Sequence, residues 1–128
     1  MRLWHEALIE DLPRAQLLGQ HRECCALRGN SWGKPHATVN YVFEYSPYRL
    51  FQYHEKVMAE MERRGYHVDP LWNDPFYRGK NCKPHDESSL NAGRGNEADP
   101  VYPEHDEAYL QECVLNLKKK GVGPAAEK

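Results

Sequence analysis

The stretch Leu12–Arg28, LPRAQLLGQHRECCALR, organises this chain, because it is the first segment with the spacing of an amphipathic helix. Asp11 is a suitable N-cap, and Pro13 suits the first turn, where a missing N–H costs nothing. Gly29 is expected to close the helix in a left-handed conformation. At about 100° per residue, five side chains share one side and predict its packing face: Leu17, Leu18, His21, Cys24 and Cys25.

A different face of the same segment carries Glu23 together with Gln16, Gly19 and Gln20. Gly19 lies one turn before Glu23, so the two are surface neighbours. A glycine inside a helix costs roughly 1 kcal/mol relative to alanine, which indicates that another segment approaches closely at this point. The obvious candidate is the start of the chain, Met1–Leu3. We therefore expect the first residues to meet the helix beside Glu23.

Met1, Arg2, Arg22 and Glu23 then form a candidate catalytic group. An α-amine has a pKa of about 7.7–8.0, against about 10.4 for lysine, so much of it is neutral and nucleophilic at cellular pH. Two nearby arginines would lower that pKa further. Such an amine attacks an aldehyde or a sugar carbon and forms an imine, while a carboxylate beside it moves a proton. The alternative is that Glu23 and Arg22 are ordinary exposed helix residues.

Two further helices are expected. Ser46-Pro47 is a cap followed by proline, and apolar residues recur at helical spacing from there to Arg64-Gly65. A third helix is expected from Pro103 to the lysine-rich stop at 118–121. The start of the chain is expected to pack as an arm or a turn through four apolar side chains, Leu3, Trp4, Leu8 and Ile9, and residues 36–45 to form a short helix or a strand.

The segment 66–102 reads as a long irregular connection, and its acidic, Gly- and Asn-rich part 87–99 is expected to be flexible. The sequence thus predicts a single domain over residues 1–121 and a tail over 122–128.

The composition limits the possible functions. The chain has 128 residues and a net charge of −2, so a fold that grips nucleic acid by charge alone is not indicated. Its first half is the less acidic one, and a polyanion is expected to bind there. The four cysteines form no C-x-x-C pair, no signal peptide precedes them, and no apolar run approaches the roughly 20 residues of a membrane span. We expect a soluble cytoplasmic protein with free thiols, taken as a monomer.

Two other sets of side chains are chemically suited to binding a ligand. A tetrahedral zinc site is conceivable from His21, Cys24, Cys82 and His85, but ordinary free thiols and a buried histidine are favoured, so we predict no metal and no cofactor. Aromatic and basic residues spread over the middle of the chain are suited to stacking bases and holding phosphates: Trp32, Lys34, His36, Tyr41, Tyr45, Arg49, Tyr77, Arg78 and Lys80. Such residues are equally common on plain surfaces.

Several short motifs follow one another through most of the chain: Leu12-x-x-x-Gln16-Leu17-x-x-x-x-Arg22-Glu23, His36-x-Thr38-x-x-Tyr41, Arg64-Gly65-Tyr66, Tyr77-Arg78-Gly79 and Pro103-x-His105. In this order they resemble the phage endonuclease V type of pyrimidine-dimer DNA glycosylase with abasic-site lyase activity, and most closely a cellular branch of that group. The resemblance implies a compact all-α domain of three main helices, with the N-terminus threaded between the first two.

The resemblance also implies roles for individual residues. The α-amine of the first residue is the nucleophile in that family and a helix glutamate the acid/base, which points to Met1 and Glu23. We expect Met1 to be retained because Arg2 is bulky. DNA is the implied partner, and the candidate substrate contacts are Arg2, Arg22, Arg28, His36, Tyr41, Arg78 and Lys80. Two alternatives stay open: a non-catalytic relative that binds nucleic acid or protein, and a small zinc-binding protein.

Overall fold

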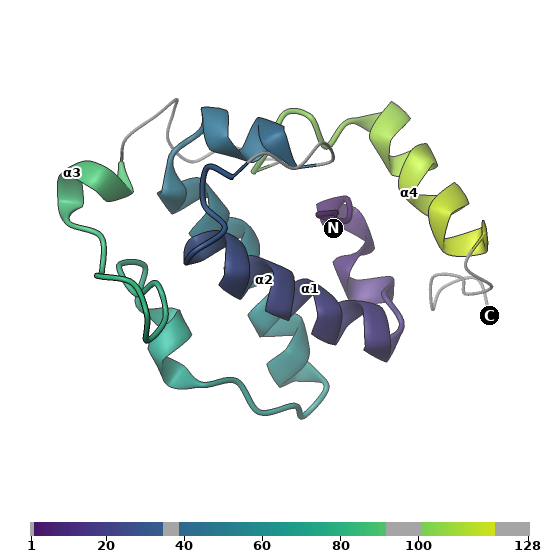
Figure 1. Ribbon diagram of the computed structural model, residues 1–128. Helices are drawn as coiled ribbons and strands as arrows, with labels where there is room; N and C mark the ends of the chain where they lie inside the picture. The colour runs from purple at the N-terminus through teal and green to yellow at the C-terminus, as the bar shows by residue number, and fades with distance from the viewer. Residues whose placement is uncertain (1, 35–38, 92–100, 120–128) are drawn as a thin grey trace.

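The computed structural model describes residues 2–34, 39–91 and 101–119, and that part of the chain contains helices and no strand (Figure 1). Three long helices dominate: α1 (Arg14–Arg28), α2 (Pro47–Arg63) and α4 (Glu107–Lys119). The shorter elements are α3 (Glu87–Leu90) and three 3-10 helices, η1 (Glu6–Asp11), η2 (Asn40–Glu44) and η3 (Pro70–Asn73). The predicted all-α class with three main helices is confirmed.

The start of the chain lies in the middle of the molecule, between α1 and α4 as Figure 1 shows. Its four apolar side chains, Leu3, Trp4, Leu8 and Ile9, are all buried, as predicted. They join one core with residues from the three long helices: Leu17, Cys24, Leu27, Leu50, Tyr53, Val57, Met58, Met61, Cys113 and Leu117. Burial of this apolar surface stabilises the arrangement, so the N-terminal segment is part of the core and not an appended arm.

Helix α2 begins and ends where its sequence predicts. The Ser46 side chain accepts a hydrogen bond from the Arg49 backbone N–H, and Pro47 occupies the first turn. Gly65 follows the helix with φ +86°, a conformation that glycine adopts without a steric penalty.

The two ends of α1 differ from expectation. Asp11 ends η1 instead of capping α1, and Pro13 stands at the N-cap position without a side-chain cap. Gly29 has φ −102°, outside the left-handed region. A glycine is needed there for another reason: an added Cβ would lie 2.8 Å from the Arg78 carbonyl oxygen, which is a steric clash.

The last third of the chain also differs from the prediction. Helix α4 begins at Glu107 and not at Pro103, because the Asp106 carboxylate accepts the Tyr109 backbone N–H and so starts the helix. Part of the expected flexible stretch is ordered, since α3 is capped by Asp86 and buries Leu90. Residues 92–100 and 122–128 lie outside the described residues. Of the two structures predicted for residues 36–45, a short helix or a strand, the structure has the short helix η2. None of the described helices is long and apolar enough to cross a membrane.

Candidate functional site

Gln20 of α1 holds the first residues of the chain. Its side-chain oxygen accepts a hydrogen bond from the Trp4 backbone N–H at 2.7 Å, and its side-chain nitrogen donates to the Arg2 carbonyl at 2.9 Å. The side chain is 2% exposed, so both bonds are shielded from water. Buried bonds of this kind are expensive to break, because each unpaired partner then carries its full desolvation penalty.

Two tyrosines complete the hold on this segment. The Tyr53 hydroxyl on α2 donates to the Trp4 carbonyl at 2.5 Å and also lies 2.8 Å from the Gln20 side-chain oxygen. The Tyr109 hydroxyl on α4 donates to the Leu3 carbonyl at 2.6 Å. Burial raises the pKa of both hydroxyls, so they remain protonated donors at neutral pH. Side chains from three helices therefore fix the backbone of residues 2–4.

Glu23 lies about one helical turn along α1 from Gln20. The side chain is half-buried, and its Oε2 atom is shielded from solvent without a hydrogen-bond partner among the described residues. Six other buried side-chain atoms of the described residues also have no hydrogen-bond partner, among them carboxylate oxygens of Glu6 and Glu104, so this feature alone does not single out Glu23. Among the described residues, an added Cβ at Gly19 would come within 4 Å of the Arg22 Nη2 atom alone, at 3.8 Å, so Arg2 and Leu3 do not make the close approach expected at this glycine.

Met1 lies outside the described residues, but its neighbour is well placed. The Arg2 carbonyl accepts a hydrogen bond from the Gln20 side chain, so the first described residue lies against α1. The Arg2 guanidinium turns to α4, 3.5 Å from Glu112 and over the Tyr109 ring at 5.8 Å. Arg22 is exposed.

The other predicted substrate contacts have different surroundings. Arg28 is 4% exposed and donates to three backbone carbonyls, those of Trp72, Asp74 and Tyr77. Burial lowers its pKa to about 10, so it stays charged at neutral pH. The prediction that Arg28 binds substrate does not fit this position, because its donors hold the loop after η3 onto the end of α1.

Tyr41 is part of a buried network instead of an open surface. Its hydroxyl lies 2.8 Å from the His105 Nε2 atom, and the Glu6 backbone N–H donates to His105 Nδ1 at 3.2 Å. Burial, with the nearby His5, lowers the pKa of His105 to about 3, so this histidine is neutral and donates from Nε2 to Tyr41. Arg78 donates to the carbonyls at the end of α1, and Lys80 is exposed. His36 lies outside the described residues.

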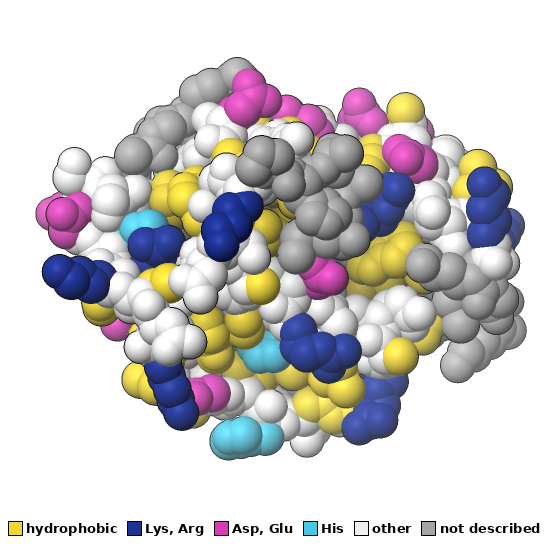
Figure 2. Space-filling model, viewed as in Figure 1, with side chains coloured by type: hydrophobic (Ala, Val, Ile, Leu, Met, Phe, Trp, Pro, Cys, Tyr) yellow, Lys and Arg dark blue, Asp and Glu magenta, His cyan; other side chains and the backbone are white. Residues whose placement is uncertain are grey.

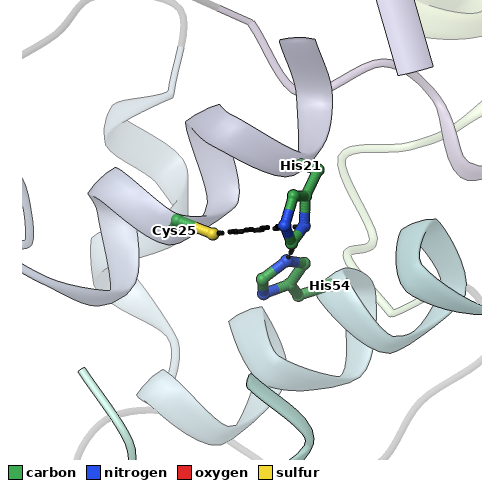
Figure 3. A group of neighbouring side chains, drawn as sticks. All are labelled: His21, Cys25 and His54. Atoms are coloured by element: carbon green, nitrogen blue, oxygen red, sulfur yellow. Dashed lines mark hydrogen bonds between the residues drawn. The ribbon is translucent and has the colours of Figure 1, made fainter. Parts of the chain in front are cut away.

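His21 and Cys25 of α1 face His54 of α2 (Figure 3). The His21 Nδ1 and His54 Nε2 atoms are 2.8 Å apart, and the Cys25 sulfur lies 3.8 Å from the other His21 ring nitrogen. Among the described residues this is the one group of three or more potential metal ligands, with ligand atoms within 4.8 Å of one another. The zinc set considered from sequence, His21 with Cys24, Cys82 and His85, is not brought together.

The chemistry of this trio does not suit a metal ion. Arg28, which only donates, lies 3.0 Å from His54 Nδ1 and forces that atom to be an acceptor. Burial holds the pKa of His54 well below its usual value, so the ring is neutral and carries its single proton on Nε2, the atom that faces His21. Metal-bound histidines normally donate their other nitrogen to an acceptor, which is the reverse arrangement. Burial also raises the pKa of Cys25 to about 11, which disfavours a thiolate ligand.

The charged surface is mixed. On the face shown in Figure 2, Lys and Arg side chains are spread singly, and Asp and Glu side chains gather mainly along the upper edge. This agrees with the net charge of −2. A nucleic acid bound here would depend on local contacts more than on a continuous basic stripe.

A profile of the family described as pyrimidine dimer DNA glycosylase matches residues 1–74, more than half of the chain. The protein belongs to this family. The matched region contains Gln20, Glu23, Tyr53 and the N-terminal segment that they surround. Searches of curated proteins and of solved structures found no match.

The sequence analysis did not identify the side chains that hold the backbone of residues 2–4. Helical spacing puts Gln20 beside Glu23 and outside the predicted packing face, but the structure buries it to 2% exposure through its bonds to the backbone of residues 2 and 4. The available signal was a large amide one turn from a candidate catalytic carboxylate. Tyr53 and Tyr109 carried no such signal, because they follow Gln20 by 33 and 89 residues.

Proposed function

We propose that this protein is a DNA glycosylase and abasic-site lyase that acts through an imine on the α-amine of Met1, with Glu23 as the acid/base. The position of Glu23, about one turn along α1 from the Gln20 side chain that bonds to the backbone of Arg2 and Trp4, carries the proposal. Membership in the pyrimidine dimer DNA glycosylase family supports DNA as the substrate and pyrimidine dimers as the lesion. The non-catalytic relative remains the second candidate, because basic side chains are spread singly over the face shown in Figure 2 and form no continuous track there for a DNA duplex.

The proposed reaction uses groups of this chain alone. The neutral α-amine adds to C1′ of an abasic sugar, and loss of water gives the imine. Glu23 donates the proton that leaves with the water and then accepts a proton from C2′. The electron pair of that C–H bond forms a double bond as the C3′–O bond breaks, and the 3′ phosphate departs. On a damaged nucleotide, attack of the same amine on C1′ displaces the base first.

Fixed geometry is the contribution of the surrounding fold. An amine on a free chain end samples many positions, and catalysis benefits when the reacting groups are already oriented. Gln20, Tyr53 and Tyr109 fix the backbone of residues 2–4, the residues that follow the proposed nucleophile in the chain. Arg22, exposed beside Gly19, is the basic residue best placed for a backbone phosphate.

Borohydride trapping tests the proposal. The protein is mixed with a labelled duplex that contains one abasic site, and the imine is reduced to a stable amine. We expect a covalent adduct whose modified peptide contains Met1. A tag fused in front of Met1, or acetylation of the α-amine, should abolish the adduct, whereas the same tag at the C-terminus should not. A duplex bearing a pyrimidine dimer is the second substrate.

Lys118→Ala provides the control for an adventitious amine, because Lys118 is exposed in the last turn of α4 and has no proposed role in binding. Trapping should survive this change. An adduct on a lysine, or no adduct with either duplex, would overturn the proposal in favour of the non-catalytic relative.

A further inference from the structure

Two neighbouring pockets share Arg78 as a common wall. The larger, of about 490 Å³, is lined by aromatic and basic side chains that include Trp32, Phe43, Tyr45, Lys83 and His85. The smaller, of about 300 Å³, is lined by the end of α1 and by Trp72, Gly79, Lys80 and Cys82. Glu23 lines neither pocket, so this is a second place on the molecule. The larger volume lies within the usual range of small-ligand sites, about 300–1,000 Å³.

Each pocket offers one indole ring. Trp32 is half-buried and packs edge-on against Phe43, with ring centroids 5.1 Å apart and an interplanar angle of 80°. Trp72 is also half-buried: Tyr77 packs against it with ring centroids 4.8 Å apart, and the Arg28 guanidinium lies over its ring, 4.9 Å from the centroid. Gly79 lies at the edge of the second ring in a left-handed conformation, with φ +95°, that favours glycine. Rings fixed by their neighbours lose little freedom when a planar group stacks on them.

The cations are placed between and beside these rings. Arg78 is held by two bonds, from Nε to the Arg28 carbonyl at 2.9 Å and from Nη2 to the Gly29 carbonyl at 3.1 Å. A guanidinium has five N–H donors, so this anchoring leaves others for a ligand. Lys83 stands at the larger pocket and Lys80 at the smaller one, both exposed.

We propose that these two pockets bind two successive unpaired nucleotides of a nucleic-acid strand, with one base in each pocket and the linking phosphate at Arg78. Sites for single strands combine a cationic track with aromatic platforms, because every base has a face that stacks. Two platforms on either side of one guanidinium match the repeat of base and phosphate along a strand. Binding at this place does not depend on chemistry at Met1 or Glu23.

Fluorescence anisotropy with a fluorescein-labelled single-stranded DNA of mixed sequence tests this site. The measurement uses the full chain carrying Glu23→Gln, so that cleavage does not interfere and failure of the catalytic proposal leaves the result readable. Trp32→Ala should weaken binding about tenfold, the order expected for one stacked base. Trp32→Phe, which keeps a ring, should recover most of the loss. The charge reversals Lys80→Glu and Lys83→Glu should each weaken binding and reduce its salt dependence.

Two control variants lie outside both pockets. Tyr66→Ala removes another half-buried aromatic ring, and Lys118→Glu reverses another exposed lysine. Both should bind the strand like the parent protein. The proposal is overturned if Trp32→Ala and the two reversals leave affinity unchanged while circular dichroism shows a folded protein. A free mononucleotide that binds as tightly as the strand would also overturn it, since only one pocket would then be used.

Discussion

The two sides of α1 both bury polar groups, but they differ in how completely those groups are paired. On one side, Arg28, His54 and His21 form a chain of hydrogen bonds in which both ring nitrogens of His54 are paired. On the other side, Gln20 is fully bonded to the start of the chain while Glu23 keeps a buried oxygen without a described partner. A saturated network stabilises a fold, whereas an unpaired buried carboxylate is available for proton transfer.

Removing Arg28, on the fully hydrogen-bonded side of α1, should have the largest effect, and that effect is on stability. Arg28→Met leaves three partly buried backbone carbonyls and the buried His54 Nδ1 atom without their donor, so the free energy of unfolding should fall by about 3 kcal/mol or more. Urea denaturation at pH 7 measures the loss. Arg22→Met, on the exposed surface of the same helix, should change stability by less than about 0.5 kcal/mol. Equal losses in the two variants would remove the distinction between the two arginines.

Removing the negative charge of Glu23, on the other side of α1, should lower the rate of strand cleavage and leave stability nearly unchanged. Glu23→Gln keeps the shape of the side chain and should lower strand cleavage at an abasic site roughly 10²-fold or more, the contribution expected of general acid–base catalysis. Single-turnover cleavage of a labelled duplex gives the rate, and thermal unfolding should be nearly unchanged. Glu55→Gln, on the exposed surface of α2, is the matched control. A slow variant that has also lost its fold would assign Glu23 a structural role.

Acid should weaken the support of the chain start. His105 stacks on His5, bonds to Glu6, and has a folded pKa of about 3. Between about pH 6.5 and pH 3 the unfolded chain binds a proton at this residue and the folded chain does not, so stability falls as the pH drops. At pH 5 this one group should account for a loss of about 2 kcal/mol relative to pH 7.

His105→Gln isolates that contribution, because glutamine does not titrate. The variant should be less stable at pH 7, and the difference in unfolding free energy between pH 7 and pH 5 should shrink by about 2 kcal/mol. An unchanged pH dependence would mean that His105 is protonated in the folded protein.

The smallest expected effect comes from the glycine beside Glu23. Gly19→Ala should stabilise the protein by up to about 1 kcal/mol, because alanine favours the helix and the added Cβ meets only Arg22 at 3.8 Å. If DNA approaches α1 at this point, cleavage should fall while the melting temperature rises. Opposite changes in the two measurements would show that the open surface serves binding; a gain in both would show that Gly19 is dispensable.

Local patterns predicted much of the fold. The cap and proline at Ser46-Pro47 correctly located α2, and helical spacing placed Glu23, Gly19 and Gln20 on one face of α1. Predictions failed where a distant segment decides the local structure. Gly29 is not left-handed because the Arg78 carbonyl packs against it, and α4 starts late because Asp106, and not an earlier residue, caps it.

The sequence by itself determined which helices form and which groups are chemically suited to the proposed reaction, because helix periodicity and the low pKa of an α-amine are local properties. Only the tertiary structure decided which arginine bonds to backbone carbonyls inside the protein and which side chains hold residues 2–4. Arg28 is buried by a loop about 45 residues further along, and the backbone of residues 2–4 is held by side chains of three separate helices, Gln20, Tyr53 and Tyr109. Such contacts join residues far apart in sequence, and no local pattern records them.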